Sequence, residues 1–357
     1  MTQHFSAADA NPSTRRRFLG QLVQTTVAAG MSGAVLEAVG PGATAFAAEA
    51  QRPAGRVRQR VLGKTGLKVS EIGFGGHSWS YAQVPDTGGS LRKVTVDEAV
   101  EMIRSGLERG VNFLDSCTPE EESSTPGEAL KRLQARDRVI VSIRVTHVMK
   151  GRKEDRDEIY KWTDRRLALW QTDHVDLCLL CNTENDTPQS GYWDMSYSIE
   201  ALDKLKQQGK IRYTGFGCHF TPELFQQAID KFGDYFDICS VPYNVRHRAA
   251  ETVLQAAKKK NLGTITIKPF ARGSLLKGRD LAQADSGLPR DMISFVLENP
   301  QVDLCTCGVH TLDHVRENFS ASWTKLTPAG RKRLEIAAAT PCSGTYHAWL
   351  ENDWRRA

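Results

Sequence analysis

Three residues that could do chemistry, Asp115, Arg144 and Cys181, each stand at the end of a short apolar segment. A carboxylate in such a place can enter a cleft. An arginine beside it would hold it ionised, because an opposite charge favours the charged form and the pKa of arginine is above about 12. A thiol is only a weak hydrogen-bond donor. These residue types predict a polar cleft that binds an anion or a substrate oxygen. A buried Asp115–Arg144 ion pair that only joins two strands is the alternative.

The elements that must position these residues alternate along the chain. The segments predicted as strands are Glu71–Gly75, Val111–Asp115, Val139–Val145, Val175–Leu180, Tyr213–Gly217, Phe236–Val241, Gly263–Lys268 and Val302–Cys307. Amphipathic segments predict helices over Val96–Arg109, Asp155–Gln171, Ile199–Gln208, Pro222–Lys231, Ala249–Lys260, Arg290–Glu298 and Leu312–Ser320. This alternation predicts an α/β protein, a closed (β/α)8 TIM barrel. The absence of a GxGxxG motif between a strand and a helix argues against an open doubly wound sheet.

The segment before the first strand predicts a β-hairpin, because Arg58–Leu62 and Leu67–Ser70 flank the turn Gly63-Lys64-Thr65-Gly66. In a (β/α)8 barrel, function sits at the carboxyl ends of the strands and in the loops that follow them. Further candidates by this rule are Cys218, His219, Tyr243, Lys268 and Gly308.

The segment Gly110–Glu120, which reads GVNFLDSCTPE, resembles the GVNFxDTAxxYG segment of aldo-keto reductases. Arg60–Ser70 is similar to the family's opening hairpin, Gly209–Gly215 to its GKIRxxG signature, and Ile267–Leu275 to its loop after strand seven. Glu298–Val302 and Glu317-Asn318 resemble the region around strand eight. The resemblance covers residues 56–340 and implies a barrel whose floor is plugged by the N-terminal β-hairpin.

The resemblance also implies a catalytic site. Members use an aspartate, a lysine and a histidine with a tyrosine that donates a proton to the carbonyl while NADPH delivers hydride. At the matching positions this chain has Asp115, Glu120 for the tyrosine, Arg144 for the lysine and Cys181 for the histidine. Arginine cannot relay a proton. We therefore expect carbonyl reduction to lose the factor of about 10²–10⁴ that general acid catalysis contributes. A solvated loop carboxylate is the alternative for Glu120.

The same resemblance implies a nicotinamide cofactor, NADP or NAD. His219 stands where the family has an asparagine that binds the nicotinamide amide, Cys218 where it has a serine, and Tyr243 where a residue stacks near the ring. The other candidates for cofactor binding are Lys268, Phe270, Arg272, Gly273, Ser274, Gly308, Glu317 and Asn318. His314 stands at the position where the family usually has an arginine near the adenosine 2′-phosphate. The sequence therefore does not decide whether the cofactor is NADP or NAD. A barrel that binds no nucleotide, with Tyr243 in the core, is the alternative.

The first fifty residues resemble a twin-arginine export signal. Thr14-Arg15-Arg16-Arg17-Phe18-Leu19 precedes an apolar region and the cleavage pattern Ala45-Phe46-Ala47. We predict a signal peptide over residues 1–47, a linker over 48–56, the barrel over 57–340 and a C-terminal tail over 341–357. The twin-arginine translocation machinery would then carry the folded protein to the periplasm or the exterior. A basic tail followed by an Ala-rich helix is the alternative.

The composition limits the kinds of partner that the protein could bind. The net charge of +5 over 357 residues is small and dispersed, which argues against nucleic acid, and the body has no apolar run long enough to span a membrane. The eight cysteines permit disulfides or buried thiols. Soft ligands that could meet at strand ends are Cys117, Cys181, Cys218, His219 and Cys307. Their spacing matches no recognised zinc, copper or iron–sulfur pattern, so we predict no metal site.

The function predicted first is that of an exported aldo-keto reductase-like oxidoreductase. It would reduce or oxidise a carbonyl or hydroxyl group of a small, sugar-like substrate, with a tightly bound nicotinamide cofactor and a modified mechanism. The alternative is a non-catalytic binding protein on the same barrel, in which Arg144 and His219 bind an anion. A metal- or thiol-dependent enzyme that uses the cysteines is the third hypothesis.

Overall fold

A closed barrel of eight parallel strands forms the centre of the protein. The computed structural model describes residues 55–80, 84–85, 91–116, 123–146, 148–182, 194–218, 221–277, 279 and 286–339. The barrel strands are β3 (Ile72–Phe74), β6 (Phe113–Asp115), β7 (Ile140–Thr146), β8 (Val175–Asn182), β9 (Ile211–Cys218), β10 (Ile238–Pro242), β11 (Gly263–Ile267) and β12 (Leu304–Cys307). They close in the order β10-β11-β12-β3-β6-β7-β8-β9. The predicted (β/α)8 barrel is therefore confirmed.

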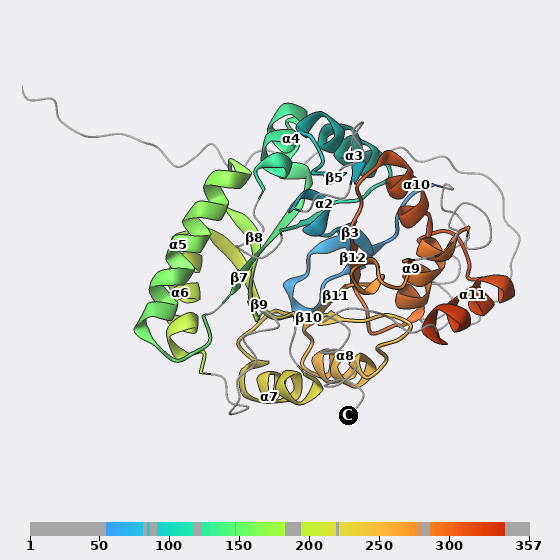
Figure 1. Ribbon diagram of the computed structural model, residues 1–357. Helices are drawn as coiled ribbons and strands as arrows, with labels where there is room; N and C mark the ends of the chain where they lie inside the picture. The colour runs from blue at the N-terminus through green and yellow to red at the C-terminus, as the bar shows by residue number, and fades with distance from the viewer. Residues whose placement is uncertain are drawn as a thin grey trace, which may run out of the picture. The chain divides into compact units, whose positions relative to one another are not determined.

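Helices surround these strands (Figure 1). They are α3 (Val96–Glu108), α4 (Thr125–Leu133), α5 (Lys153–Trp170), α6 (Ser196–Gln207), α7 (Pro222–Phe232), α8 (Ala250–Lys259), α9 (Leu288–Glu298) and α10 (Leu312–Ser320). The short helix α2 (His77–Ser80) follows β3, and α11 (Pro328–Ala339) packs against α9. Helix α4 was not predicted, because Pro126 and Gly127 read as loop residues. Proline is nevertheless well accepted in the first turn of a helix.

The predicted hairpin is present as β1 (Gln59–Val61) and β2 (Lys68–Ser70), joined by the 3₁₀ turn η1 (Gly63–Thr65). Gly63 lies so close to the chain leading into β11 that a Cβ atom there would be 2.2 Å from the backbone nitrogen of Gly263. Its φ of +47° is also a conformation that favours glycine. The Lys64 N–H donates to the Asn261 carbonyl at 2.8 Å. These contacts hold the hairpin against the segment that precedes β11.

A buried carboxylate, Glu71, ties this hairpin to the barrel. It accepts hydrogen bonds from Arg58 Nε at 2.6 Å and Arg60 Nε at 2.8 Å, both on the hairpin side. The Ser322 hydroxyl, just beyond α10, donates to the same carboxylate at 2.7 Å. Glu71 itself is fully buried. One charge at the start of β3 therefore links the beginning and the end of the described barrel.

Side chains on the barrel strands alternate between two apolar clusters, as the pleat of a strand requires. The inner cluster fills the barrel and consists of Leu62, Val69, Phe113, Leu177, Leu179, Cys181, Ile238, Ile265, Ile267 and Leu304. The larger outer cluster lies between strands and helices and includes Leu114, Ile143 and Val145. This parity directs Asp115 and Arg144 inward at the carboxyl ends of β6 and β7.

Five cysteines of the barrel strands are free thiols, buried in these layers. They are Cys178, Cys181, Cys239, Cys305 and Cys307. A search of the described residues finds no helix that is long and apolar enough to cross a membrane. The predicted export signal, linker and C-terminal tail lie outside the described residues, apart from residues 55–56 of the linker.

Candidate active site

A buried ion pair between Asp115 and Arg144 lies at the carboxyl ends of β6 and β7. Arg144 Nη2 is 2.6 Å and Nε 3.1 Å from the same carboxylate oxygen, Oδ2 of Asp115. The exposed fractions of the two residues are 2% and 4%. Oδ1 of Asp115 is buried and has no hydrogen-bond partner among the described residues. The predicted pairing of Asp115 with Arg144 is therefore present, and Oδ1 of Asp115 remains without a hydrogen-bond partner among the described residues.

The guanidinium of Arg144 connects several strands. Nη1 lies 3.4 Å from Sγ of Cys181 on β8, and both terminal nitrogens lie 3.5 Å from Oγ of Ser240 on β10. The Arg144 backbone N–H donates to Oγ of Ser116 at 3.2 Å. Cys181 is fully buried, which agrees with a packed thiol that touches the arginine. Ser240 was not predicted as a site residue. A polar residue inside the apolar segment of β10 nevertheless indicates a side chain that points into the barrel.

The close approach of β9 to β10 depends on Gly217. A Cβ atom there would lie 2.0 Å from the backbone carbonyl oxygen of Ser240, and the φ of this glycine is +147°. Any larger residue would push the two strands apart. The position of Ser240 beside Arg144 therefore depends on glycine in the GFG segment of β9.

Cationic side chains from several strand ends act electrostatically on His77, the first residue of α2. Burial lowers the pKa of His77 well below its ordinary value, and the charges of Lys268, Arg272, Arg144 and His310 lower it further. His77 is thus neutral at pH 7. The positive charges at pH 7 come from Arg144 on β7 and from Lys268 and Arg272 in the loop after β11. Such a concentration of one sign in a partly buried site attracts anions. His77 was not predicted, because its loop reads as a glycine-rich turn.

The loop after β11 holds two of these cations in an unusual backbone conformation. The φ angles of Lys268, Ala271 and Arg272 are 63°, 47° and 56°, in the left-handed region that non-glycine residues rarely adopt. The Asn244 side chain donates to the Lys268 carbonyl at 3.0 Å and supports the loop. Such strain clusters at functional sites.

Three further residues of this loop were predicted to bind the cofactor. Gly273 is exposed, and the Ser274 hydroxyl donates a hydrogen bond within the loop. Phe270 packs against the apolar clusters on either side.

The loop after β12 contacts His77 through His310. Nε2 of His310 lies 3.2 Å from the His77 carbonyl oxygen, and the His310 N–H donates to Nδ1 of His314 at 3.3 Å. Burial lowers the pKa of His310 to about 4 and also lowers that of His314. A Cβ atom at Gly308 would lie in ordinary contact with the His310 ring, 3.6 Å from its nearest atom. Both histidines are neutral at pH 7 in this place.

Tyr243 faces away from the site, contrary to the expectation that it stacks near a nicotinamide ring. Its hydroxyl donates to Oε1 of Glu251 at 3.0 Å, and its ring lies 5.6 Å from the Phe295 ring. It belongs to the outer cluster and is 2% exposed. The reason is strand parity: Ser240 points inward, so a residue three positions later points outward.

Two predicted residues of α10 also lie in the outer layer. Burial raises the pKa of Glu317, and the charges that act on it belong to Arg290 and Asp291 at the start of α9. Asn318 is buried, and its amide nitrogen lies 3.9 Å from Sγ of Cys307. Neither residue is brought together with the Asp115–Arg144 pair.

Several candidates lie outside the described residues: Cys117, Glu120 and His219. Of Cys218 the structure gives only the backbone, as the last residue of β9. Within the described part of the chain, no group of three or more His, Cys, Asp or Glu side chains could hold a metal ion.

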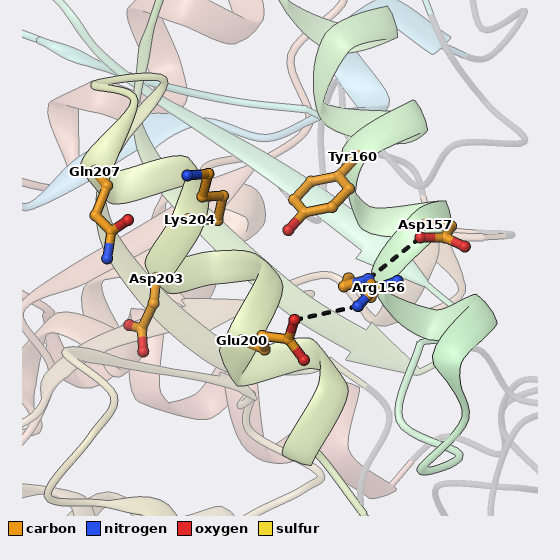
Figure 2. Close-up of a pocket in the computed structure, with 7 residues that line it drawn as sticks. All are labelled: Arg156, Asp157, Tyr160, Glu200, Asp203, Lys204 and Gln207. Carbon is orange, nitrogen blue, oxygen red and sulfur yellow. Dashed lines mark hydrogen bonds and ion pairs between the residues drawn. The ribbon is translucent and has the colours of Figure 1, made fainter.

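A surface pocket of about 480 Å³ lies on the outside of the barrel, between α5 and α6 (Figure 2). Within it, Arg156 lies 3.3 Å from Asp157 and 3.1 Å from Glu200. No residue of the Asp115–Arg144 site lines it. It is therefore separate from the candidate active site.

The depressed pKa of His310 predicts a pH dependence of stability. A histidine that is neutral when folded takes up a proton more readily when unfolded, so stability is present above pH 6.5 and is lost as the pH falls toward about 4. We expect His310→Gln to reduce the difference in free energy of unfolding between pH 7 and pH 5 by about 1 kcal/mol, as measured by urea titration. The exposed His174 gives a control, His174→Gln. An unchanged difference in His310→Gln would contradict the prediction.

Together these features define the class of the protein: a (β/α)8 barrel with its charged site at the end where barrel enzymes carry their active sites. The chain belongs to the aldo/keto reductase family, whose model matches residues 71–292. It is accordingly an aldo-keto reductase-like oxidoreductase.

Relatives support this assignment. L-galactose dehydrogenase of Arabidopsis thaliana is 27% identical over 297 residues, which cover 74% of this chain and 88% of that protein. An aldo-keto reductase from Bacillus halodurans has a TM-score of 0.59 at 22% identity, over 82% of this chain and 99% of that one. One from Klebsiella pneumoniae, solved in complex with NADPH, has a TM-score of 0.59 at 21% identity, over 81% and 98% of the two chains. The structural likenesses concern the fold.

Proposed function

We propose that the protein is an exported, NADP(H)-dependent oxidoreductase that acts on a hydroxyl or carbonyl group of a small, sugar-like substrate. The proposal rests on the buried Asp115–Arg144 ion pair at the carboxyl ends of β6 and β7, with Lys268 and Arg272 in the loop that follows β11 at the same end of the barrel.

The described residues fit an anionic dinucleotide. Lys268 and Arg272 supply positive charge from a loop with a strained backbone, and Arg272 is exposed. Gly308 follows β12 at the same end of the barrel. Lys268 and Arg272 would hold the phosphates of NADP(H), with Gly308 beside them. When bound, this cofactor accepts or supplies hydride. A structural neighbour crystallised with NADPH supports the choice of cofactor.

The nature of the substrate is argued from the site and from one relative. Asp115 Oδ1 can accept a hydrogen bond and Arg144 can donate one, which suits a group with several hydroxyls. The Arabidopsis relative is an L-galactose dehydrogenase, and its name points to the same class of substrate. We therefore propose a sugar or related polyol. The loss of the family's tyrosine and lysine types favours a modified route for the proton.

The proposal of export rests on the twin-arginine motif at Thr14–Leu19 and on the cleavage pattern at Ala45–Ala47. A protein exported in the folded state can take its cofactor with it from the cytoplasm. The proposed location is the periplasm or the exterior, with the nicotinamide cofactor tightly held. Mass and absorbance analysis of the protein expressed with its leader and purified from the periplasm tests both points. Protein without nucleotide would contradict the tight binding.

Nucleotide binding gives the sharpest test. We expect Lys268→Ala and Arg272→Ala each to weaken NADP⁺ affinity roughly tenfold, because each removes a charged contact worth about 1.5 kcal/mol. Isothermal titration with NADP⁺ and NAD⁺ measures this loss. Lys204 is exposed on α6, far from the loop in sequence, and Lys204→Ala is the matched control. A wild-type protein that binds neither nucleotide would refute the proposed function.

A further inference from the structure

Four residues in the loop after β11 have positive backbone φ angles. The angles are 63° at Lys268, 47° at Ala271, 56° at Arg272 and 84° at Gly273. A left-handed backbone is unfavourable for residues other than glycine, because Cβ comes too close to the following carbonyl oxygen. Three of these four residues are not glycine. The loop therefore keeps this conformation only because neighbouring groups hold it.

The side chain of Asn244 holds the first of these residues. Asn244 is fully buried just after β10, and its Nδ2 donates to the Lys268 carbonyl oxygen at 3.0 Å. The Ala271 N–H donates to the same oxygen, also at 3.0 Å. Oδ1 of Asn244 accepts from the backbone N–H groups of Arg246 at 3.0 Å and His247 at 3.2 Å. One amide group thus joins the loop after β10 to the turn that begins at Lys268.

A second support of the loop is apolar. Ala271 is fully buried in a cluster with Val245, from the loop after β10, and Leu334 of α11. The loop after β10 is itself fastened to α11, since Nη1 of Arg246 donates to the Ala338 carbonyl oxygen at 2.8 Å. The neighbouring loop that carries Asn244 is therefore fixed in place and can hold the strained loop.

Lys268 and Arg272 are the two cations that the proposed function assigns to the cofactor phosphates. Lys268 is half-buried and Arg272 is exposed. Both side chains leave the chain at left-handed residues, so their directions depend on the loop conformation. The apparent affinity for a ligand is reduced by the fraction of the protein that holds the binding conformation. A buried group that stabilises this loop therefore raises nucleotide affinity without touching the nucleotide.

We propose that Asn244 is a positioning residue of the nucleotide site, whose amide group keeps the loop after β11 in the conformation in which Lys268 and Arg272 bind phosphate. The inference rests on the proposed function. Asn244 acts through the Lys268 carbonyl oxygen, because that oxygen is the point at which its amide reaches the strained loop. Loss of the amide should allow the loop to relax toward ordinary backbone angles, which turns the two cations away.

Nucleotide binding tests this role. Asn244→Leu is close in size and removes the hydrogen bond to Lys268. We expect it to weaken NADP⁺ binding about tenfold in isothermal titration, because a lost buried hydrogen bond changes a conformational equilibrium by roughly this factor. The smaller Asn244→Ala is a second variant with the same expectation. Asn112→Leu is the matched control, since Asn112 precedes β6 at the opposite end of the barrel, where its Nδ2 donates to the Lys68 carbonyl oxygen at 2.9 Å.

NMR of the nucleotide-free protein measures the loop itself. The intraresidue HN–Hα NOE, which is strong at positive φ, should be strong at Ala271 and Arg272 in the wild type and weaker in both Asn244 variants. Exchange of the Ala271 amide should become about tenfold faster, in step with the loss of affinity. The Tyr243 amide, which donates to the Ile267 carbonyl oxygen at 3.1 Å, should exchange as in the wild type.

The outcomes separate this inference from the proposed function. Asn244 variants that keep the strong NOEs, or that bind NADP⁺ within about threefold of the wild type, overturn the inference. Equal weakening by Asn112→Leu also overturns it, because the effect would then come from a general loss of stability. A wild type that binds nucleotide while the Asn244 variants bind it unchanged removes only this inference. A wild type that binds neither NADP⁺ nor NAD⁺ removes the proposed function as well.

Discussion

Replacing Arg144 by methionine is expected to destabilise the folded protein by about 3–5 kcal/mol. The change leaves Asp115 as a buried, unpaired charge, and breaking one side of a buried ion pair costs about this much. The effect should be at the upper end, because Oδ1 of Asp115 already lacks a partner among the described residues. Urea unfolding at pH 7, followed by circular dichroism, measures the change.

A double variant separates the charge from the packing. Arg144→Met with Asp115→Asn removes both charges, so much of the lost stability should return. Arg132→Met is the control, because Arg132 is exposed and pairs with Asp97 at 2.7 Å and Glu128 at 3.1 Å. Exposed pairs contribute about 1 kcal/mol or less. A double variant as unstable as Arg144→Met would show that the guanidinium acts through its contacts to Cys181 and Ser240 instead.

Replacing Glu71 by leucine should destabilise the protein by about 2–4 kcal/mol. Glu71 is fully buried, whereas the side chains of Arg58 and Arg60 are 30% and 24% exposed. The arginines can regain some water after the substitution, so the cost should be smaller than for Arg144. The loss also releases the hydroxyl of Ser322. Urea unfolding measures the effect, and hydrogen exchange should show faster opening of β1 and β2.

The control for this prediction is Glu101→Leu on α3. The side chain of Glu101 is 53% exposed and pairs with Arg104 three residues later. Its removal should cost less than about 1 kcal/mol. Equal effects of Glu71→Leu and Glu101→Leu, or hairpin exchange that stays as slow as in the wild type, would refute the anchoring role.

The barrel could be predicted because its strands alternate with helices at a regular spacing, and because each strand carries a continuous apolar segment. The pairing of Asp115 with Arg144 followed, since both stand at inward positions of adjacent strands. Tyr243 was misplaced because its role came from a resemblance, whereas the parity of β10 directs it outward. Ser240 could have been found by that same parity. His77 could not, because its environment is made by charges from distant segments.

The buried thiols of the barrel strands have a consequence for how the chain meets an oxidising environment. Burial raises the pKa of Cys178 and of Cys305 to about 12, so neither forms the thiolate that attacks oxidants or other disulfides. In an unfolded chain the same thiols would be reactive and could form mispaired cross-links. Under the proposed export in the folded state, these five buried thiols would stay protected from oxidants and would need no oxidative folding catalyst.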